Sequence, residues 1–200
     1  MNVRKQLPGI CFVPGLFSST EVFAHHVMDG EIPTTFLQGL LSGLAHPVIG
    51  LDHLMFLLMA GVLARSLEFP MRFTVPLLFV VSALFGTSLQ LSGVTLQSAE
   101  VLIALSVIAA GGLVIWQHRI RAIPLSVLLV FAGLFHGYAY AEAIVGSETA
   151  PLAAYLIGLA MIHYAVIVAT MITVEKIFNP RVIPYVGSTA LLVGVFYLSV

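Results

Sequence analysis

Cysteine and charged residues are both scarce in this sequence, and each scarcity excludes a class of protein. Only 8% of the 200 residues are charged, and the formal net charge is −1. A nucleic-acid-binding protein needs a basic patch, which this chain does not have, so we expect no nucleic-acid partner. The single cysteine, Cys11, can form neither a disulfide framework nor a thiolate metal cage. Any metal ion would therefore be bound by nitrogen and oxygen atoms.

Hydrophobic residues are abundant instead. They make up 60% of the chain, and the mean hydropathy is +1.07, which is well above that of a soluble globular domain. We therefore predict an all-α polytopic membrane bundle. Membrane lipid is then one of its partners.

Six apolar segments have the length, or nearly the length, of the ~20 residues that a membrane crossing needs. They are residues 50–64, Met71–Leu91, 97–117, 124–145, 151–174 and 183–200. Residues 34–45 form an apolar segment of about twelve residues, which is too short to cross. We expect about six transmembrane helices plus a short non-spanning helix.

The first 24 residues have the features of a signal peptide. Two basic residues precede an apolar run, and a small residue, Ala24, comes directly before His25. Prolines interrupt the apolar run, so an uncleaved leader stays open as an alternative. Cleavage after Ala24 would leave one transporter domain, residues 25–200, beginning with His25 and His26. The free α-amino group and two imidazoles would suit a divalent ion, although a solvated polar terminus is the alternative.

Basic residues lie in alternate connections between the predicted spans, which predicts that these connections face the cytoplasm. The residues concerned are Arg65, Arg72, Arg119, Arg121, Lys176 and Arg181. The other connections carry no Lys or Arg. Both ends of the processed chain should therefore lie outside.

A short stretch places two imidazoles and a carboxylate, His46, Asp52 and His53, among apolar residues. Within a membrane each ionisable group costs on the order of 2.5–3.5 kcal/mol unless a partner or water satisfies it. Pro47 and Gly50 lie between them and predict a helix break, which is tolerated at membrane depth only inside protein or beside a wet cavity. The stretch therefore predicts a binding site, and a hydrogen-bonded structural trio is the alternative.

Two further histidines are expected near the midplane of the membrane. His136 and His163 each lie about twelve residues into spans that run in opposite directions, which corresponds to a depth of ~18 Å. Their imidazoles could meet there, and Glu142, with Tyr138 and Tyr140, continues outward from His136. These groups would form a ladder of nitrogen and oxygen donors. For His163, a core histidine bonded to a neighbouring Ser or Thr is the alternative.

Pairs of small residues predict close contacts between helices rather than chemistry. The pairs are Gly39 with Gly43, Gly111 with Gly112, and Gly133 with Gly137. Residues 42–47 and 132–137 look alike, but apolar helices match one another by chance, so a duplicated half stays open.

The polar residues resemble the signatures of the HupE/UreJ family of nickel/cobalt permeases, and the resemblance covers most of the chain. The first signature, H-x5-D-H, is matched by His46, Asp52 and His53. The second, F-H-G-x-[AV]-H-G-x-E, is met in part, because Tyr140 stands at its second His and Glu142 lies one place before its Glu. The matching positions of the second signature are Phe135, His136, Gly137 and Ala139.

The resemblance implies a transporter and not an enzyme. It implies uptake of nickel or cobalt across the bacterial inner membrane, with the ion as transported substrate, no cofactor, and a role in supplying metal to hydrogenase or urease. The chemistry of the donors agrees, because imidazole with carboxylate suits Ni²⁺, Co²⁺ and Zn²⁺, whereas Cu(I) prefers sulfur and Mg²⁺ or Ca²⁺ prefers oxygen.

Two other functions remain open from the residues alone. One is an intramembrane hydrolase in which His46, His53 and either His136 or His163 hold zinc while Asp52 activates water. The other is a structural membrane subunit. The phosphate-binding pattern G-x-x-x-x-G-K-[ST] is absent, so this chain does not itself use ATP through such a loop.

The predicted orientation can be tested with reporter fusions. A reporter fused after Val200 should be external, and one inserted at residues 119–121 should be cytoplasmic, because the distribution of basic residues sets both. Alkaline phosphatase and green fluorescent protein, which are active on opposite sides, would measure this. A cytoplasmic C-terminus would contradict the prediction of six spans and would require residues 34–45 to cross.

Overall fold

The computed structural model describes residues 31–116, 120–177 and 179–200. The predicted leader and two candidate metal ligands, His25 and His26, lie outside the described residues. Within those residues every regular element is helical, which confirms the predicted all-α fold.

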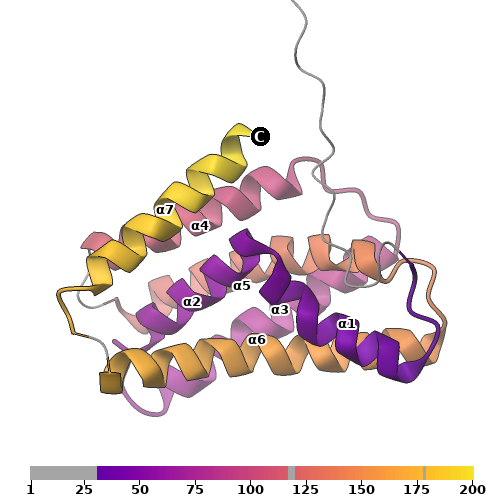
Figure 1. The fold of residues 1–200 in the computed structure, drawn as a ribbon, viewed down its shortest axis with the longest axis horizontal. Helices are drawn as coiled ribbons and strands as arrows, with labels where there is room; N and C mark the ends of the chain where they lie inside the picture. The colour runs from indigo at the N-terminus through magenta and orange to yellow at the C-terminus, as the bar shows by residue number, and fades with distance from the viewer. Residues whose placement is uncertain (1–30, 117–119, 178) are drawn as a thin grey trace, which may run out of the picture.

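The described part of the chain folds into one elongated bundle of seven α-helices and a short 3-10 helix (Figure 1). In chain order they are α1 (Phe36–Ile49), α2 (Leu51–Ala64), α3 (Met71–Leu91), α4 (Ala99–Trp116), α5 (Ala122–Tyr140), η1 (Ala141–Ala143), α6 (Thr149–Ile177) and α7 (Ile183–Ser199).

Four of these elements are long and apolar enough to cross a membrane. They are α3, α4, α5 together with η1, and α6. The bent pair of α1 and α2 makes a fifth if it counts as one span, and α7 is a shorter apolar helix of 17 residues. Large apolar side chains such as Val81, Val127 and Leu192 are exposed on the flanks, as expected for side chains that face lipid. The chain is a multi-pass membrane protein.

The break between α1 and α2 is at Gly50, where the chain bends by 79°. Gly50 has an extended backbone, with φ −69° and ψ 109°, and it ends one helix and begins the next. Pro47, which was expected to share in the break, is buried inside the last turn of α1. The break therefore depends on Gly50, three residues beyond the proline.

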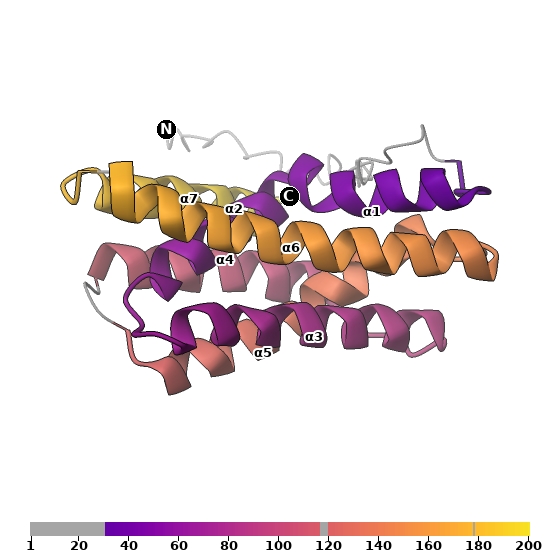
Figure 2. The same ribbon diagram turned by 90° about the horizontal axis from the view of Figure 1, so that it is seen from below.

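The two halves of the broken helix follow a single path beside α6. Gly43 of α1 packs against the backbone of Tyr155, and Gly61 of α2 packs against the backbone of Ile167. The residue numbers increase together, so the pair runs parallel to α6, as Figures 1 and 2 show. Each half has 14 residues, a length of ~21 Å, which is shorter than the ~30 Å hydrocarbon core. Residues 34–45 were predicted to dip separately from a span at 50–64, whereas in the structure α1 and α2 follow one bent path along α6.

Glycines allow three helix pairs to pack backbone against backbone: α3 with α5, α4 with α7, and α1 with α6. A side chain at Gly86 in α3 would collide with the backbone of Leu134 and Tyr138 in α5. The predicted close contacts are confirmed at Gly39, Gly43, Gly111, Gly133 and Gly137. Gly112 is an exception, because nothing lies within 4 Å of the place where its Cβ would stand.

Helix α2 lies at the centre of this arrangement. It packs against every other α-helix of the described chain, and Phe56, Leu57 and Met59 on it are fully buried. The stripe that contains Met55 and Met59 belongs to the apolar core. Since Asp52 and His53 lie in the first turn of α2, the candidate site is attached to the most enclosed helix.

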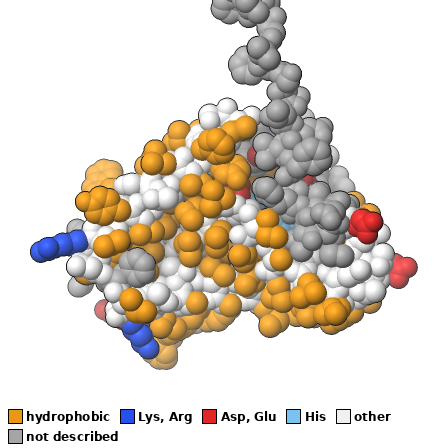
Figure 3. All heavy atoms as spheres, in the orientation of Figure 1, with side chains coloured by type: hydrophobic (Ala, Val, Ile, Leu, Met, Phe, Trp, Pro, Cys, Tyr) orange, Lys and Arg blue, Asp and Glu red, His pale blue; other side chains and the backbone are white. Residues whose placement is uncertain are grey.

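The charged side chains lie mainly at the two ends of the bundle, and its flank is apolar (Figure 3). At one end, the loops after α2 and α6 meet, and Arg72 of α3 forms an ion pair with Glu175 of α6. Arg65 and Arg181 lie in or beside the same loops. This is the end that the distribution of basic residues assigns to the cytoplasm.

The contact between α3 and α5 predicts different effects for two identical substitutions. Gly86→Ala should destabilise the protein by roughly 1–3 kcal/mol, because its methyl group would meet the backbone of α5. Gly112→Ala is the matched control, since it adds the same group to open space on α4 and should leave stability unchanged or slightly raised. Unfolding of both purified variants in the same detergent measures the difference. Equal losses would contradict the close packing of α3 on α5.

Candidate functional site

Four buried histidines from four different helices form what we call the histidine cluster: His46 of α1, His53 of α2, His136 of α5 and His163 of α6. His46 and His53 are each 8% exposed, whereas His136 and His163 are completely buried. The ring centres of His46 and His53 are 6.4 Å apart, and those of His53 and His136 are 4.9 Å apart. The bend at Gly50 brings the first two together, since they flank it in sequence.

Tyr140, the last residue of α5, is the shared neighbour of the cluster. Its ring centre lies 5.3 Å from that of His46, 4.5 Å from that of His53 and 5.0 Å from that of His163. The Tyr155 hydroxyl of α6 donates a hydrogen bond of 2.6 Å to the backbone oxygen of Tyr140 and lies 3.5 Å from His46 Nδ1. The end of α5 is thereby tied to α6 beside the cluster.

A chain of hydrogen bonds joins Ser106 of α4 to His136 and then to His53. Ser106 Oγ lies 2.9 Å from His136 Nε2, and His136 Nδ1 lies 2.9 Å from His53 Nδ1. Ser106 Oγ also donates to the carbonyl oxygen of Ile103 at 2.7 Å. Since a carbonyl can only accept and a hydroxyl has one proton, Ser106 must accept from His136 Nε2–H.

This donor assignment determines the tautomers of both histidines when they are neutral. With its proton on Nε2, His136 presents the lone pair of Nδ1, so His53 donates its Nδ1–H there. The remaining nitrogen of His53, Nε2, then carries a lone pair. A hydrogen bond at one ring nitrogen that leaves the other free to bind is the usual arrangement of a metal-ligating histidine.

Asp52 combines a structural and an electrostatic role at the start of α2. Its Oδ1 accepts a 2.8 Å hydrogen bond from the backbone N–H of His53. Gly50, the residue before the helix, has no side chain to cap it, and a carboxylate in the first turn is stabilised by the helix dipole. Asp52 is half-buried, so it places negative charge beside His53 at the edge of the cluster.

His163 is buried without the expected partner. In the described part of the chain neither of its ring nitrogens has a hydrogen-bond partner, and the Tyr140 hydroxyl has none either. The alternative in which a Ser or Thr bonds to His163 is therefore wrong for these residues. The predicted meeting of His136 and His163 is indirect, because both rings contact Phe79, at 5.9 Å and 5.1 Å between centres.

Three other residues were predicted as ligands. Glu142 lies on η1 with an exposed side chain, and His25 and His26 are outside the described residues. Among the residues that the structure describes, no three His, Cys, Asp or Glu side chains lie close enough to hold a metal ion together. The histidine cluster consists of neighbouring pairs rather than a closed cage.

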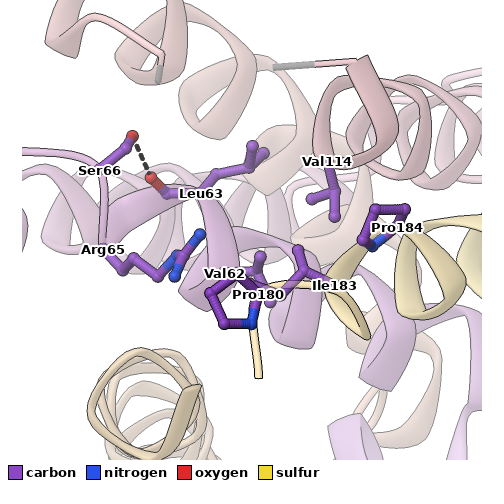
Figure 4. Close-up of a pocket in the computed structure, with 8 residues that line it drawn as sticks. All are labelled: Val62, Leu63, Arg65, Ser66, Val114, Pro180, Ile183 and Pro184. Carbon is purple, nitrogen blue, oxygen red and sulfur yellow. Dashed lines mark hydrogen bonds between the residues drawn. The ribbon is translucent and has the colours of Figure 1, made fainter. Parts of the chain in front are cut away.

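Two hollows lie along the later part of α2, beyond the cluster. The one shown in Figure 4 has a volume of about 40 Å³. It is lined by Val62, Leu63, Arg65, Ser66, Val114, Pro180, Ile183 and Pro184. The second, about 270 Å³, shares Val62 and Ile183 with the first and lies between α2, α6 and α7. Neither is lined by a histidine, so the cluster is separate from both.

Ser106 and Tyr155 were not predicted as parts of the site, and Tyr140 was predicted only as a donor on the ladder outward from His136. A signal existed for Tyr140, because it occupies the position of an imidazole in the second signature. Ser106 and Tyr155 reach the cluster from α4 and α6, and nothing in their local sequence distinguishes them from other polar residues in apolar helices.

Comparison with known proteins gave two matches. A family model described as HupE / UreJ protein matches residues 13–197. Protein HupE of Rhizobium leguminosarum bv. viciae is 30% identical over 127 residues. That alignment covers 62% of this chain and 66% of the relative, which is just under two thirds of its length. No solved structure matches the chain.

The assignment of the tautomers can be tested by nuclear magnetic resonance of the protein with ¹⁵N-labelled histidine. His136 should carry its proton on Nε2 and His53 on Nδ1, and Ser106→Ala should change both signals because it removes the acceptor for His136. Ser82→Ala is the control, since this buried serine of α3 bonds only to the backbone carbonyls of Phe79 and Leu129. A proton on Nδ1 of His136 would show that the chain of donors runs the other way.

Proposed function

The chain belongs to the HupE/UreJ family, and from that membership and its histidine cluster we propose that it is a permease that takes up nickel or cobalt ions across the bacterial inner membrane. The ion is the transported substrate. The proposal assigns the protein neither a resident cofactor nor a catalysed reaction.

One observation carries the proposal, which is the increase in burial of the imidazoles from the helix break toward the bundle interior. His46 and His53 at the break are each 8% exposed, and His136 and His163 are completely buried. Burying an imidazole costs free energy unless it is hydrogen-bonded or binds a ligand, so buried imidazoles within a membrane protein indicate a functional site. Four of them in succession, on four helices, suit an ion that is passed from one donor group to the next.

The donor atoms favour borderline divalent ions. The cluster offers imidazole nitrogens with a carboxylate beside them, the set that suits Ni²⁺, Co²⁺ and Zn²⁺. Asp52 supplies negative charge next to His53, which offsets part of the cost of removing water from a divalent cation. We assign the outer site to His46, Asp52 and His53, and the next site inward to His136.

Pairs of donors suit transport better than a complete ligand shell does. Conduction requires each site to bind the ion well enough to admit it and weakly enough to release it. The ring centres of His46, His53 and His136 follow one another at 6.4 Å and 4.9 Å. An ion could then be held by the next imidazole before it leaves the last one.

We further propose that the start of α1 faces the outside and that the end with Arg65 and Arg72 faces the cytoplasm. The basic loops meet at that end, which supports the orientation. Glu142, together with His25 and His26 of a processed chain, would then attract ions at the outer surface. Inside the cell, the metal would enter the pathway that supplies hydrogenase or urease.

The first test concerns the outer site. Asp52→Asn keeps the shape of the side chain but removes its charge, so equilibrium binding of Co²⁺ should weaken about tenfold, or about 1.4 kcal/mol, while the protein still folds. Titration of purified protein with Co²⁺ in detergent measures this. Glu148→Gln is the matched control, since it removes an exposed charge from the loop before α6. Identical affinities in both variants would exclude Asp52 from the outer site.

The second test separates binding from passage. His136→Ala should leave Co²⁺ bound at the outer site but slow its uptake into proteoliposomes about tenfold or more, because the next donor inward is lost. Binding and uptake are measured on the same purified protein. If His136→Ala abolished binding while Asp52→Asn changed neither quantity, the proposed order of sites would be wrong.

A further inference from the structure

The least explained group in the described chain is the imidazole of His163. It is completely buried, and neither ring nitrogen has a hydrogen-bond partner. The hydroxyl of Tyr140, 5.0 Å away between ring centres, is buried and unpartnered as well. Buried polar groups are nearly always satisfied, and leaving one unsatisfied costs on the order of 1–3 kcal/mol. Two such groups side by side need an explanation.

The packing around His163 does not supply that explanation. Its ring meets the edge or face of two aromatic rings, those of Phe79 on α3 and Tyr140 on α5. A phenylalanine at this position would make similar apolar contacts without any unsatisfied nitrogen. The fold therefore gains nothing from the two nitrogens of His163.

The position of His163 relates it to the ion path. The Tyr155 hydroxyl of α6 bonds to the backbone oxygen of Tyr140 at the end of α5, so these two residues lie at a similar level. From that level both helices lead into the bundle. His136 lies four residues before Tyr140, or ~6 Å, and His163 lies eight residues after Tyr155, or ~12 Å. His163 therefore lies deeper than His136, and Tyr140 contacts both His53 and His163.

From this geometry we propose that His163 is a third station for the transported divalent ion, one step inward from the pair of His53 and His136, with the Tyr140 hydroxyl as a second donor. The proposal rests on the proposed transport of Ni²⁺ or Co²⁺. An ion at His163 would bind a nitrogen that is unpaired in the empty protein, so no internal hydrogen bond has to break before it binds. The unsatisfied imidazole of His163 and hydroxyl of Tyr140 are then the donor groups of an empty binding site.

The proposal predicts that His163 contributes to transport without contributing to stability. His163→Phe and His163→Gln, in the full chain reconstituted into vesicles, should both lower Co²⁺ uptake about tenfold or more. The midpoint of thermal unfolding should be unchanged or higher for His163→Phe, since a buried unsatisfied group is removed. Tyr164→Phe is the matched control, because this adjacent hydroxyl donates to the Phe73 carbonyl, away from the cluster.

A double variant gives a sharper test. Tyr140 contacts the rings of His46, His53 and His163, so an imidazole placed there would lie within the same group. Tyr140→His combined with His163→Phe should restore part of the Co²⁺ uptake that His163→Phe loses. X-ray absorption of the Co²⁺-loaded proteins should show fewer imidazole ligands per ion in His163→Phe than in the unaltered chain.

The outcomes of these experiments distinguish a transport role of His163 from a structural one. Uptake by both single variants at the unaltered rate would overturn the assignment of His163, and so would loss of the fold in both of them, because His163 would then be structural. A double variant as inactive as His163→Phe would also count against it. If the unaltered chain neither binds nor transports Co²⁺ and Ni²⁺, the proposed function itself fails, which is a different result from normal transport by the His163 variants.

Discussion

The rest of this structure depends on one constraint: a helix that begins inside an apolar bundle must have the polar groups of its first turn satisfied by protein. Helix α2 begins at Gly50, part of the way along the bundle, where the chain bends by 79°. In lipid, the free N–H groups of its first turn would have no partner. Asp52 accepts from one of them, and the other helices surround α2 on all sides. The helices that enclose this break also surround the four histidines, and they supply hydrogen-bond partners such as Ser106 that lipid lacks.

Close packing of the outer helices makes that enclosure possible. In each of three helix pairs, α3 with α5, α4 with α7 and α1 with α6, glycines bring one backbone against another. Since lipid tails are as apolar as leucine, such contacts and interhelical hydrogen bonds provide the association energy. Thr87, for example, donates from α3 to the carbonyl oxygen of Gly137 in α5 at 2.7 Å. His136 is next to that glycine, so its position depends on how closely the two helices approach.

Much of the fold could be predicted from the sequence, and the exceptions have physical reasons. Met71–Leu91 was predicted with its observed ends, because a mainly apolar segment begins directly after Pro70 and ends before the Ser92-Gly93 turn. Helix α6 extends to Ile177, beyond the predicted end at residue 174, since Glu175 pairs with Arg72 across the bundle. The proximity of His46 to His53 follows from their spacing around Gly50. Contacts of Tyr140 with three imidazoles could not be predicted, because they depend on where the ends of α1, α5 and α6 meet.

The bonds from Ser106 through His136 to His53 have a further consequence. All of their donors point the same way, from His53 toward α4, so their dipoles add, with the negative end at Nε2 of His53. Reversing the direction of these hydrogen bonds would require His53, His136 and Ser106 to move their protons together. A serine hydroxyl on a helix that contributes no imidazole thus determines which nitrogen of His53 carries the lone pair. In the proposed transport, the negative end of this row would favour a cation beside His53 before any ligand bond forms, and replacing the Ser106 hydroxymethyl group with a methyl group would remove the acceptor that fixes the row.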